Sequence, residues 1–141
     1  MKKLILLTLL LFVTINITIG YEPKKNVIEI IGNELCMKNI ILYMEKIELD
    51  HIPVLRAQIR HETGNLKKIN HKNNLFGFRY NTYKTFPSWK ACLDYAKKWQ
   101  MKRSSKYDQN SVESYLSFLI NIGYASDTSY IENLRKYKTF K

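Results

Sequence analysis

VLRAQIRHETGNLKKINHKNNLFGFR, residues 54–79, is the stretch that decides the fold of this 141-residue chain. Leu55, Ile59 and Glu62 are spaced i, i+4 and i+7, so a helix through them places the Glu62 carboxylate on the same face as two apolar residues. Gly64 predicts the end of this helix, because glycine adopts the left-handed cap conformation at little cost. Glu62 is therefore expected in the last helical turn.

The predicted position of Glu62 is unusual for a carboxylate. The helix dipole is negative at this end and disfavours an anion. Partial burial also penalises the ionised form, so both effects should raise the pKa of Glu62. A carboxylic acid that stays protonated near neutral pH is suited to general acid catalysis. The alternative is a solvated helix-end residue whose stem merely touches the core.

Residues 1–20 have the order of a secretory signal peptide: the basic Lys2 and Lys3, an apolar run, and small residues ending at Gly20. We expect cleavage after Gly20, which leaves one domain over residues 21–141. The mature protein would then be secreted or periplasmic, without membrane contact. An uncleaved membrane anchor is the alternative, although the apolar run is short for a membrane span.

The chain is strongly basic, with a formal net charge of +11. Without Lys2 and Lys3, 21 basic residues remain against 12 acidic ones, a net charge of +9. Such a surface favours polyanions. Predicted export favours anionic polymers of the cell envelope over nucleic acid, which we do not expect as a partner. A merely lysine-rich, solvated surface is the alternative.

The rest of the sequence predicts mainly helix. The fold class is therefore mainly α (α+β), a helical domain with one small β-hairpin. A first helix is expected from about residue 27 to 47, and a second from Pro53 to Thr63 after a cap at Asp50 or His51. Further helices are expected from Trp89 to about Met101 after a Ser88 cap, from Asn110 to Gly123 with a capping box of Asn110 and Glu113, and from Asp127 onward. Alternating aromatic residues predict a hairpin from Leu75 to Phe86.

Histidine and cysteine patterns predict neither a metal site nor a cofactor. His61 and Glu62 begin like the HExxH zinc motif, but Asn65 stands where the second histidine is required. Cys36 and Cys92 are too far apart for a CxxC motif. In an exported protein they permit a disulfide, and two free thiols with apolar neighbours are the equal alternative.

Four separated motifs resemble one known family. They are AQ-xxx-ETG at 57–64, NNLFG at 73–77, F-x-x-W at 86–89 and GYA-x-D-x-x-Y at 123–130. In this order they resemble the glucosaminidase family of bacterial cell-wall hydrolases, the mannosyl-glycoprotein endo-β-N-acetylglucosaminidase-like domain, in a short single-domain form. The resemblance covers about residues 52–134. It implies a lysozyme-like fold with a cleft and hydrolysis of the β-1,4 bond after N-acetylglucosamine in peptidoglycan glycan strands, and we expect a monomer.

The resemblance also implies roles for individual residues. Glu62 matches the catalytic acid, and Tyr124 matches the cleft tyrosine, which would hydrogen-bond the 2-acetamido group or the attacking water. Asn73 and Asn74 open the cleft-side segment, where their amides suit N-acetyl groups. Structural alternatives are a core role for Tyr124 and a turn fixed by the two asparagines. The other predicted substrate-binding residues are Phe78, Tyr80 and Asp127.

A second catalytic carboxylate, which longer members of the family carry, is missing from the expected place. No Asp or Glu occurs between Glu62 and Asp94. Catalysis would then use the substrate's own acetamido group, a water held by Tyr124, or the lytic transglycosylase route to an anhydro sugar. A non-catalytic cell-wall-binding module and a wall amidase are the rival interpretations.

Overall fold

The computed structural model describes residues 31–69, 72–124 and 129–137. The predicted signal peptide, residues 1–20, and the predicted site residue Asp127 lie outside these ranges. No helix within them is long and apolar enough to cross a bilayer. The described helices are α2 (Met37–Lys46), α3 (Ile52–Thr63), α4 (Trp89–Met101), the short 3-10 helix η2 (Ser104–Lys106), α5 (Val112–Asn121) and α6 (Ser129–Arg135). The mainly helical fold class is therefore confirmed.

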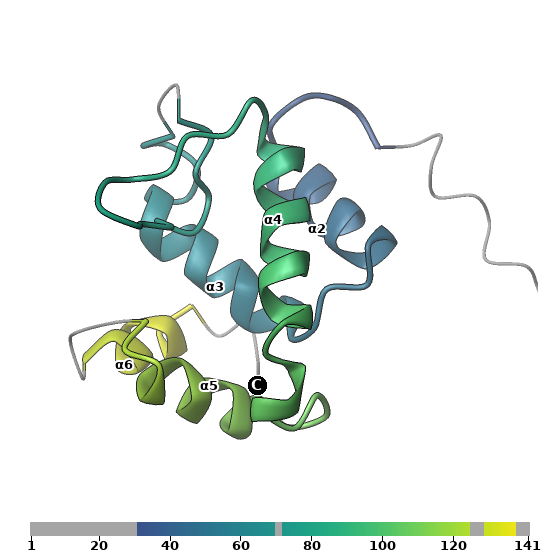
Figure 1. Ribbon diagram of the computed structural model, residues 1–141. Helices are drawn as coiled ribbons and strands as arrows, with labels where there is room; N and C mark the ends of the chain where they lie inside the picture. Colours follow the sequence, from purple (N-terminus) through teal and green to yellow (C-terminus); the bar gives the residue numbers. More distant parts are fainter. Residues whose placement is uncertain (1–30, 70–71, 125–128, 138–141) are drawn as a thin grey trace, which may run out of the picture.

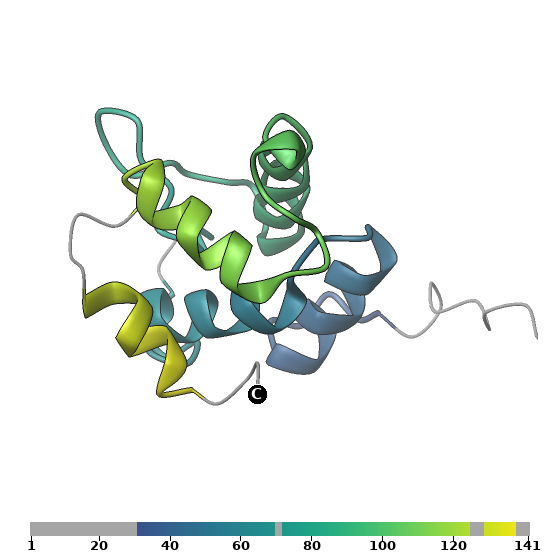
Figure 2. The same cartoon turned by 90° about the horizontal axis from the view of Figure 1, so that it is seen from below.

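Helix α3 is the central element of the domain. It crosses the molecule between α2 at one end and α6 at the other, and it packs against both (Figures 1 and 2). Its Leu55 and Ile59 are buried, as the periodicity predicts. The helix ends at Gly64, which has φ 56° and ψ 47° and donates its N–H to the Arg60 carbonyl. These local signals place Glu62 in the last turn, as predicted.

The predicted position of the α3 cap is confirmed at His51, but the predicted side-chain capping bond is not formed. His51 is the residue before the helix, but its φ is 54° and its side chain makes no capping hydrogen bond. The Asp50 carboxylate instead accepts a hydrogen bond from the Tyr107 hydroxyl at 2.9 Å. The reason is tertiary, because Asp50 faces the segment that follows α4 and not the amides of α3.

Helix α4 confirms the sequence pattern most closely. The Ser88 hydroxyl accepts the amide of Ala91 at 3.1 Å, and the helix begins at the next residue, Trp89. Cys92 and Ala96 lie on its buried face. The hydroxyl of a serine at this position satisfies an amide that has no partner inside the helix, which explains the sharp start.

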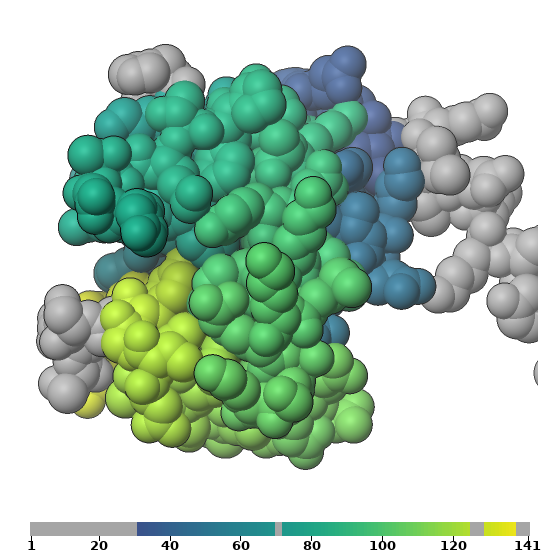
Figure 3. All heavy atoms as spheres, viewed as in Figure 1, coloured from purple at the N-terminus to yellow at the C-terminus, as the bar shows by residue number. Residues whose placement is uncertain are grey.

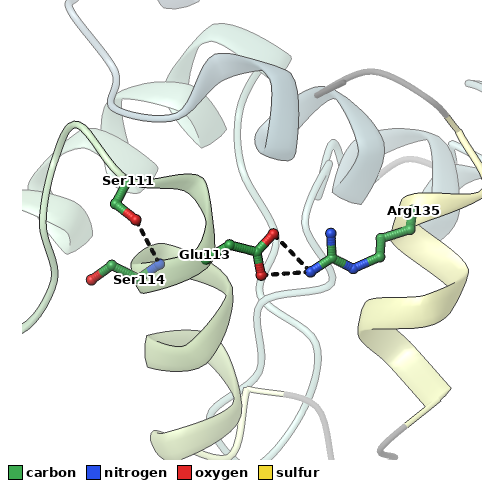
Figure 4. Close-up of polar contacts among 4 residues, drawn as sticks. All are labelled: Ser111, Glu113, Ser114 and Arg135. Atoms are coloured by element: carbon green, nitrogen blue, oxygen red, sulfur yellow. Dashed lines mark hydrogen bonds and ion pairs between the residues drawn. The ribbon is translucent and has the colours of Figure 1, made fainter.

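The predicted capping box of α5 is wrong by one residue. Ser111, not Asn110, accepts the amide of Ser114 at 3.2 Å. Glu113 is therefore not needed for capping, and its carboxylate receives both hydrogen bonds of the Arg135 guanidinium from α6, at 2.9 and 2.6 Å (Figure 4). This exposed ion pair joins α5 to α6.

The predicted β-hairpin is not formed. Among the described residues the segment has only an isolated antiparallel bridge between Arg79 and Tyr83. The side-chain amide of Asn74 replaces a neighbouring strand. Its Nδ2 donates to the carbonyls of Phe78 and Lys84 at 2.8 and 3.1 Å, and its Oδ1 accepts the Phe78 amide at 2.9 Å. These bonds satisfy the backbone that a ladder would otherwise pair.

Cys36 and Cys92 are both free thiols, so the disulfide alternative is not realised. Cys92 is buried, and its sulfur accepts the Leu75 amide at 3.4 Å. Burial raises the pKa of the Cys92 thiol to about 12. The thiol therefore helps to anchor the loop after α3 on α4 and stays protonated.

Candidate active site

Glu62 lies where two cavities meet. The large cavity has a volume of about 520 Å³ and the small cavity about 270 Å³, and both are lined by Glu62 and Gly77. In the space-filling view of the molecule, the teal segment that follows α3 lies above the surface of α5 (Figure 3). The other residues of the large cavity are His61, Phe76, Phe78, Arg79, Trp99, Gly123, Tyr124, Tyr130 and Asn133.

The Gly77 backbone fixes one side of the Glu62 carboxyl group. A Cβ atom on Gly77 would stand 2.6 Å from Glu62 Oε2 and 3.1 Å from its Cδ, which is closer than two atoms can approach without a shift. Gly77 also has φ +66°, a conformation that favours glycine. The NNLFG segment therefore ends in glycine for two independent reasons.

The protonated form of Glu62 is favoured by its surroundings. Part of the residue is exposed, but the cavity walls remove water from the carboxyl group, and this burial raises its pKa above the ordinary 4.5. His61, Arg79 and Tyr130 act in the opposite direction and only reduce the rise. The direction agrees with the sequence prediction, and it is the direction that a general acid requires.

Tyr130 connects Glu62 to the core. Its hydroxyl accepts a hydrogen bond from Gln58 Nε2 at 3.3 Å and interacts with the Glu62 carboxyl group as a hydrogen-bond partner. Gln58 is 1% exposed, one helical turn before Glu62 on α3. Since Gln58 uses its N–H as donor, the hydroxyl hydrogen of Tyr130 remains to be donated to the carboxylate.

Tyr124 holds the loop that carries Gly77. Its hydroxyl donates to the Phe76 carbonyl at 2.7 Å, one residue before Gly77. Burial raises the pKa of Tyr124 well above 10, so the hydroxyl stays neutral. Its ring lines the large cavity beside Trp99, with ring centroids 5.9 Å apart. The predicted contact of Tyr124 with substrate remains a prediction, while a packing and positioning role is observed.

The other predicted substrate-binding residues lie at different depths. Phe78 lines the large cavity but is buried, and Asn74 lines the small cavity while its amide is bonded to the loop backbone. Asn73 donates to the Phe86 carbonyl at 3.1 Å and lines neither cavity. Tyr80 is 86% exposed and also lies outside both linings. Their binding roles remain predictions.

Sequence reasoning did not select several residues of the large cavity. The sequence could have identified Tyr130 as a site residue, since it is the last residue of the GYA-x-D-x-x-Y motif. His61 was considered only as a metal ligand, and its ring contacts Tyr130 edge-on at 5.3 Å. Arg79 and Asn133 gave no sequence signal, because only the packing of the loop and of α6 around α3 brings them to the cavity.

Glu62 is the only carboxylate that the described residues contribute to either cavity. Asp94, the next acid in the chain, is on α4 and accepts a hydrogen bond from the Tyr43 hydroxyl at 3.0 Å. No cluster of three or more potential metal ligands occurs in the described part of the chain. In the described part of the chain the site therefore has one carboxylic acid, Glu62, which lies where the two cavities meet.

The family model of the mannosyl-glycoprotein endo-β-N-acetylglucosaminidases, called Glucosaminidase, matches residues 37–139. The chain belongs to the glucosaminidase family. The match begins with α2 and extends beyond α6, so it includes every residue that lines the two cavities. No curated protein and no solved structure matched the chain. Membership supports a glycoside hydrolase role on peptidoglycan, and the short, mainly helical glucosaminidase domain agrees with a lysozyme-like fold.

Proposed function

We propose that this glucosaminidase is an exported endo-β-N-acetylglucosaminidase that cleaves peptidoglycan after N-acetylglucosamine, with Glu62 as its general acid. The supporting observation is the position of Glu62, whose pKa is raised by burial, at the meeting point of two cavities. A glycan that lies along both cavities brings its glycosidic bonds past this carboxyl group. The proposed export rests on the signal-peptide order of residues 1–20.

In the proposed reaction Glu62 donates its proton to the glycosidic oxygen while the bond from that oxygen to C1 breaks. Among the described residues only Glu62 brings a carboxylate to the cavities, so in this proposal the acetamido oxygen of the same sugar attacks C1 as the nucleophile. Water then attacks C1 while the bond between C1 and the acetamido oxygen breaks, and the proton that the water loses returns to Glu62. The product ends in reducing N-acetylglucosamine, and the enzyme is restored.

A lytic transglycosylase outcome is the second candidate, and it is favoured equally by a site to which the described residues bring one carboxylate. In that reaction Glu62 again protonates the leaving oxygen. The C6 hydroxyl of the sugar, in place of water, then attacks C1 and gives its proton to the carboxylate. The product is an anhydro sugar without a reducing end.

Digestion of purified peptidoglycan tests these proposals. Residues 21–141 are prepared as wild type, as Glu62→Gln and as the control Glu45→Gln, whose carboxylate is on α2 and lines neither cavity. Mass spectrometry identifies the soluble products. We expect fragments with reducing N-acetylglucosamine ends from wild type and control, and about 10²-fold fewer from Glu62→Gln.

Each other result has one meaning. Anhydro ends assign the protein to the transglycosylases. Free amines without reducing ends would indicate a wall amidase. Binding to insoluble peptidoglycan without any fragment would identify a wall-binding module. Full activity of Glu62→Gln would contradict the role of Glu62 as the acid.

A further inference from the structure

The small cavity has a different chemical character from the large one. It shares Glu62 and Gly77 with the large cavity and is otherwise lined by Thr63, Lys68, Ile69, Lys72, Asn74 and Tyr83. Within the part of the chain that the structure describes, Lys68 and Lys72 are its only charged residues besides Glu62. When Glu62 is protonated, as a general acid must be before the reaction, the charged groups of this described lining are both cationic.

Lys68 is held in the wall of the small cavity by the turn after α3. Its amide donates to the Thr63 carbonyl at 2.8 Å. Its methylene groups lie over Gly64, where an added Cβ would be 3.3 Å from Lys68 Cδ. Packing of the stem leaves the ammonium as the group that meets solvent, and it reduces the conformational entropy that a bound anion would otherwise remove.

Lys72 is held in the lining by contacts with Phe86 and Tyr83. Its carbonyl accepts the Phe86 amide at 2.8 Å, and its ammonium lies 5.5 Å from the centre of the Tyr83 ring. The Arg79 guanidinium is 4.0 Å from the same ring and donates to the Tyr83 hydroxyl. The Tyr83 ring thus holds the cationic groups of Lys72 and Arg79 near it, and both suit a negatively charged substituent.

We propose that Lys68 and Lys72 form an anion-binding subsite beside Glu62, which takes a carboxylate or phosphate substituent on the sugar next to the cleaved bond. The inference rests on the proposed function, because a glycan bound along Glu62 is what brings such a substituent to the small cavity. The subsite selects acidic glycan strands over neutral ones. Opposite charges at the rim of a cleft act mainly on substrate binding, so the effect belongs in KM.

The test compares two double variants with the same change in net charge. Lys68→Gln/Lys72→Gln removes the subsite. Lys67→Gln/Lys98→Gln is the control, because neither Lys67 nor Lys98 lines a cavity. Substrates are soluble peptidoglycan fragments with free carboxylates, the same fragments with amidated carboxylates, and neutral N-acetylglucosamine oligomers. Fragments prepared with and without phosphate-containing wall polymers distinguish the two sources of the anion.

We expect KM for the acidic fragments to rise about 10-fold in the subsite variant with kcat within about 2-fold, as for the loss of two partly exposed charge contacts. The control should match wild type. Lys68→Arg/Lys72→Arg keeps both positive charges and should bind the acidic fragments as the wild type does. Higher ionic strength should reduce the preference of the wild type for acidic over neutral fragments. If the effect depends on the phosphate polymers, the anion is a phosphate; if it depends on free carboxylates, the anion is a carboxylate.

Equal KM values for the subsite and control variants on every substrate would overturn the inference. Affinities measured by calorimetry with the same fragments, on Glu62→Gln protein, separate it from the proposed function. A preference for acidic fragments that disappears with Lys68 and Lys72 supports the subsite even if no fragment is cleaved. Cleavage without any such preference supports the hydrolase and rejects the subsite.

Discussion

Gly77 and Glu62 are in such close contact that a methyl group on Gly77 would stand 2.6 Å from the Glu62 Oε2 atom. The contact joins the end of α3 to the loop that follows it. It sets the orientation of the only carboxyl group that lines both cavities in the described part of the chain.

Gly77→Ala should reduce both stability and activity. The left-handed φ costs about 1 kcal/mol, and the added methyl group would displace the flexible Glu62 carboxyl group, whose Oε2 it would meet at 2.6 Å. A shift of about 1 Å in Glu62 should lower kcat about 10²-fold. Gly123→Ala is the control for the cost of the left-handed φ, since Gly123 has φ +65° and nothing within 4 Å of an added Cβ. Thermal unfolding of both variants and turnover of Gly77→Ala are measured; wild-type turnover in Gly77→Ala would contradict the close contact.

Replacing Glu62 should change the pH dependence of stability. The pKa of Glu62 is higher in the folded protein than its ordinary 4.5, so folding favours the protonated form. The contribution of the protonated Glu62 carboxyl group to stability is complete below 4.5, its ordinary pKa, and is lost as the pH rises through the pKa of Glu62 in the folded protein. Glu62→Gln should therefore unfold at a higher temperature than wild type above that range, with the difference shrinking toward pH 4. A constant difference across pH would contradict the raised pKa.

Local sequence signals predicted where α3 and α4 begin or end and therefore the position of Glu62 along α3. Ser88 marks the beginning of α4, Gly64 marks the end of α3, and the periodicity correctly predicts that Leu55 and Ile59 are buried, while Glu62 in the last turn of α3 is exposed toward the cavities. Each of these depends on residues within about two turns of one another, which is the range over which sequence patterns act.

Features that depend on distant partners were not predicted. Gln58 and Tyr130 meet across 72 positions. Asn74 satisfies the backbone that the expected hairpin would have paired, because its amide reaches both sides of the loop.

The exact cap of α5 was also not predicted. Ser111 and not Asn110 caps this helix, a difference of one residue that sequence patterns do not resolve.

Tyr130→Phe should raise the pKa of Glu62 further, because the Tyr130 hydroxyl favours the ionised carboxylate. The alkaline limb of kcat/KM, on which the acid loses its proton, should move to higher pH. Stability should fall by about 1 to 2 kcal/mol, since the buried Gln58 amide loses its acceptor. Tyr137→Phe is the control, because Tyr137 follows α6 and its ring also lies beside His61, with centroids 6.5 Å apart, but it lines neither cavity. An unchanged pH profile in Tyr130→Phe would exclude this coupling.

Tyr124→Phe separates positioning from direct participation in the chemistry. The variant loses the 2.7 Å hydrogen bond to the Phe76 carbonyl, so the free energy of unfolding should fall by about 1 kcal/mol. As that carbonyl precedes Gly77, kcat should fall about 10-fold through a looser Glu62 contact. Tyr107→Phe is the control, because it loses a 2.9 Å hydrogen bond to Asp50 away from the cavities and should lose stability with unchanged kcat. If Tyr124→Phe instead lost most of its kcat at unchanged stability, Tyr124 would act on the substrate or the attacking water, since positioning of the loop cannot fail without weakening its attachment.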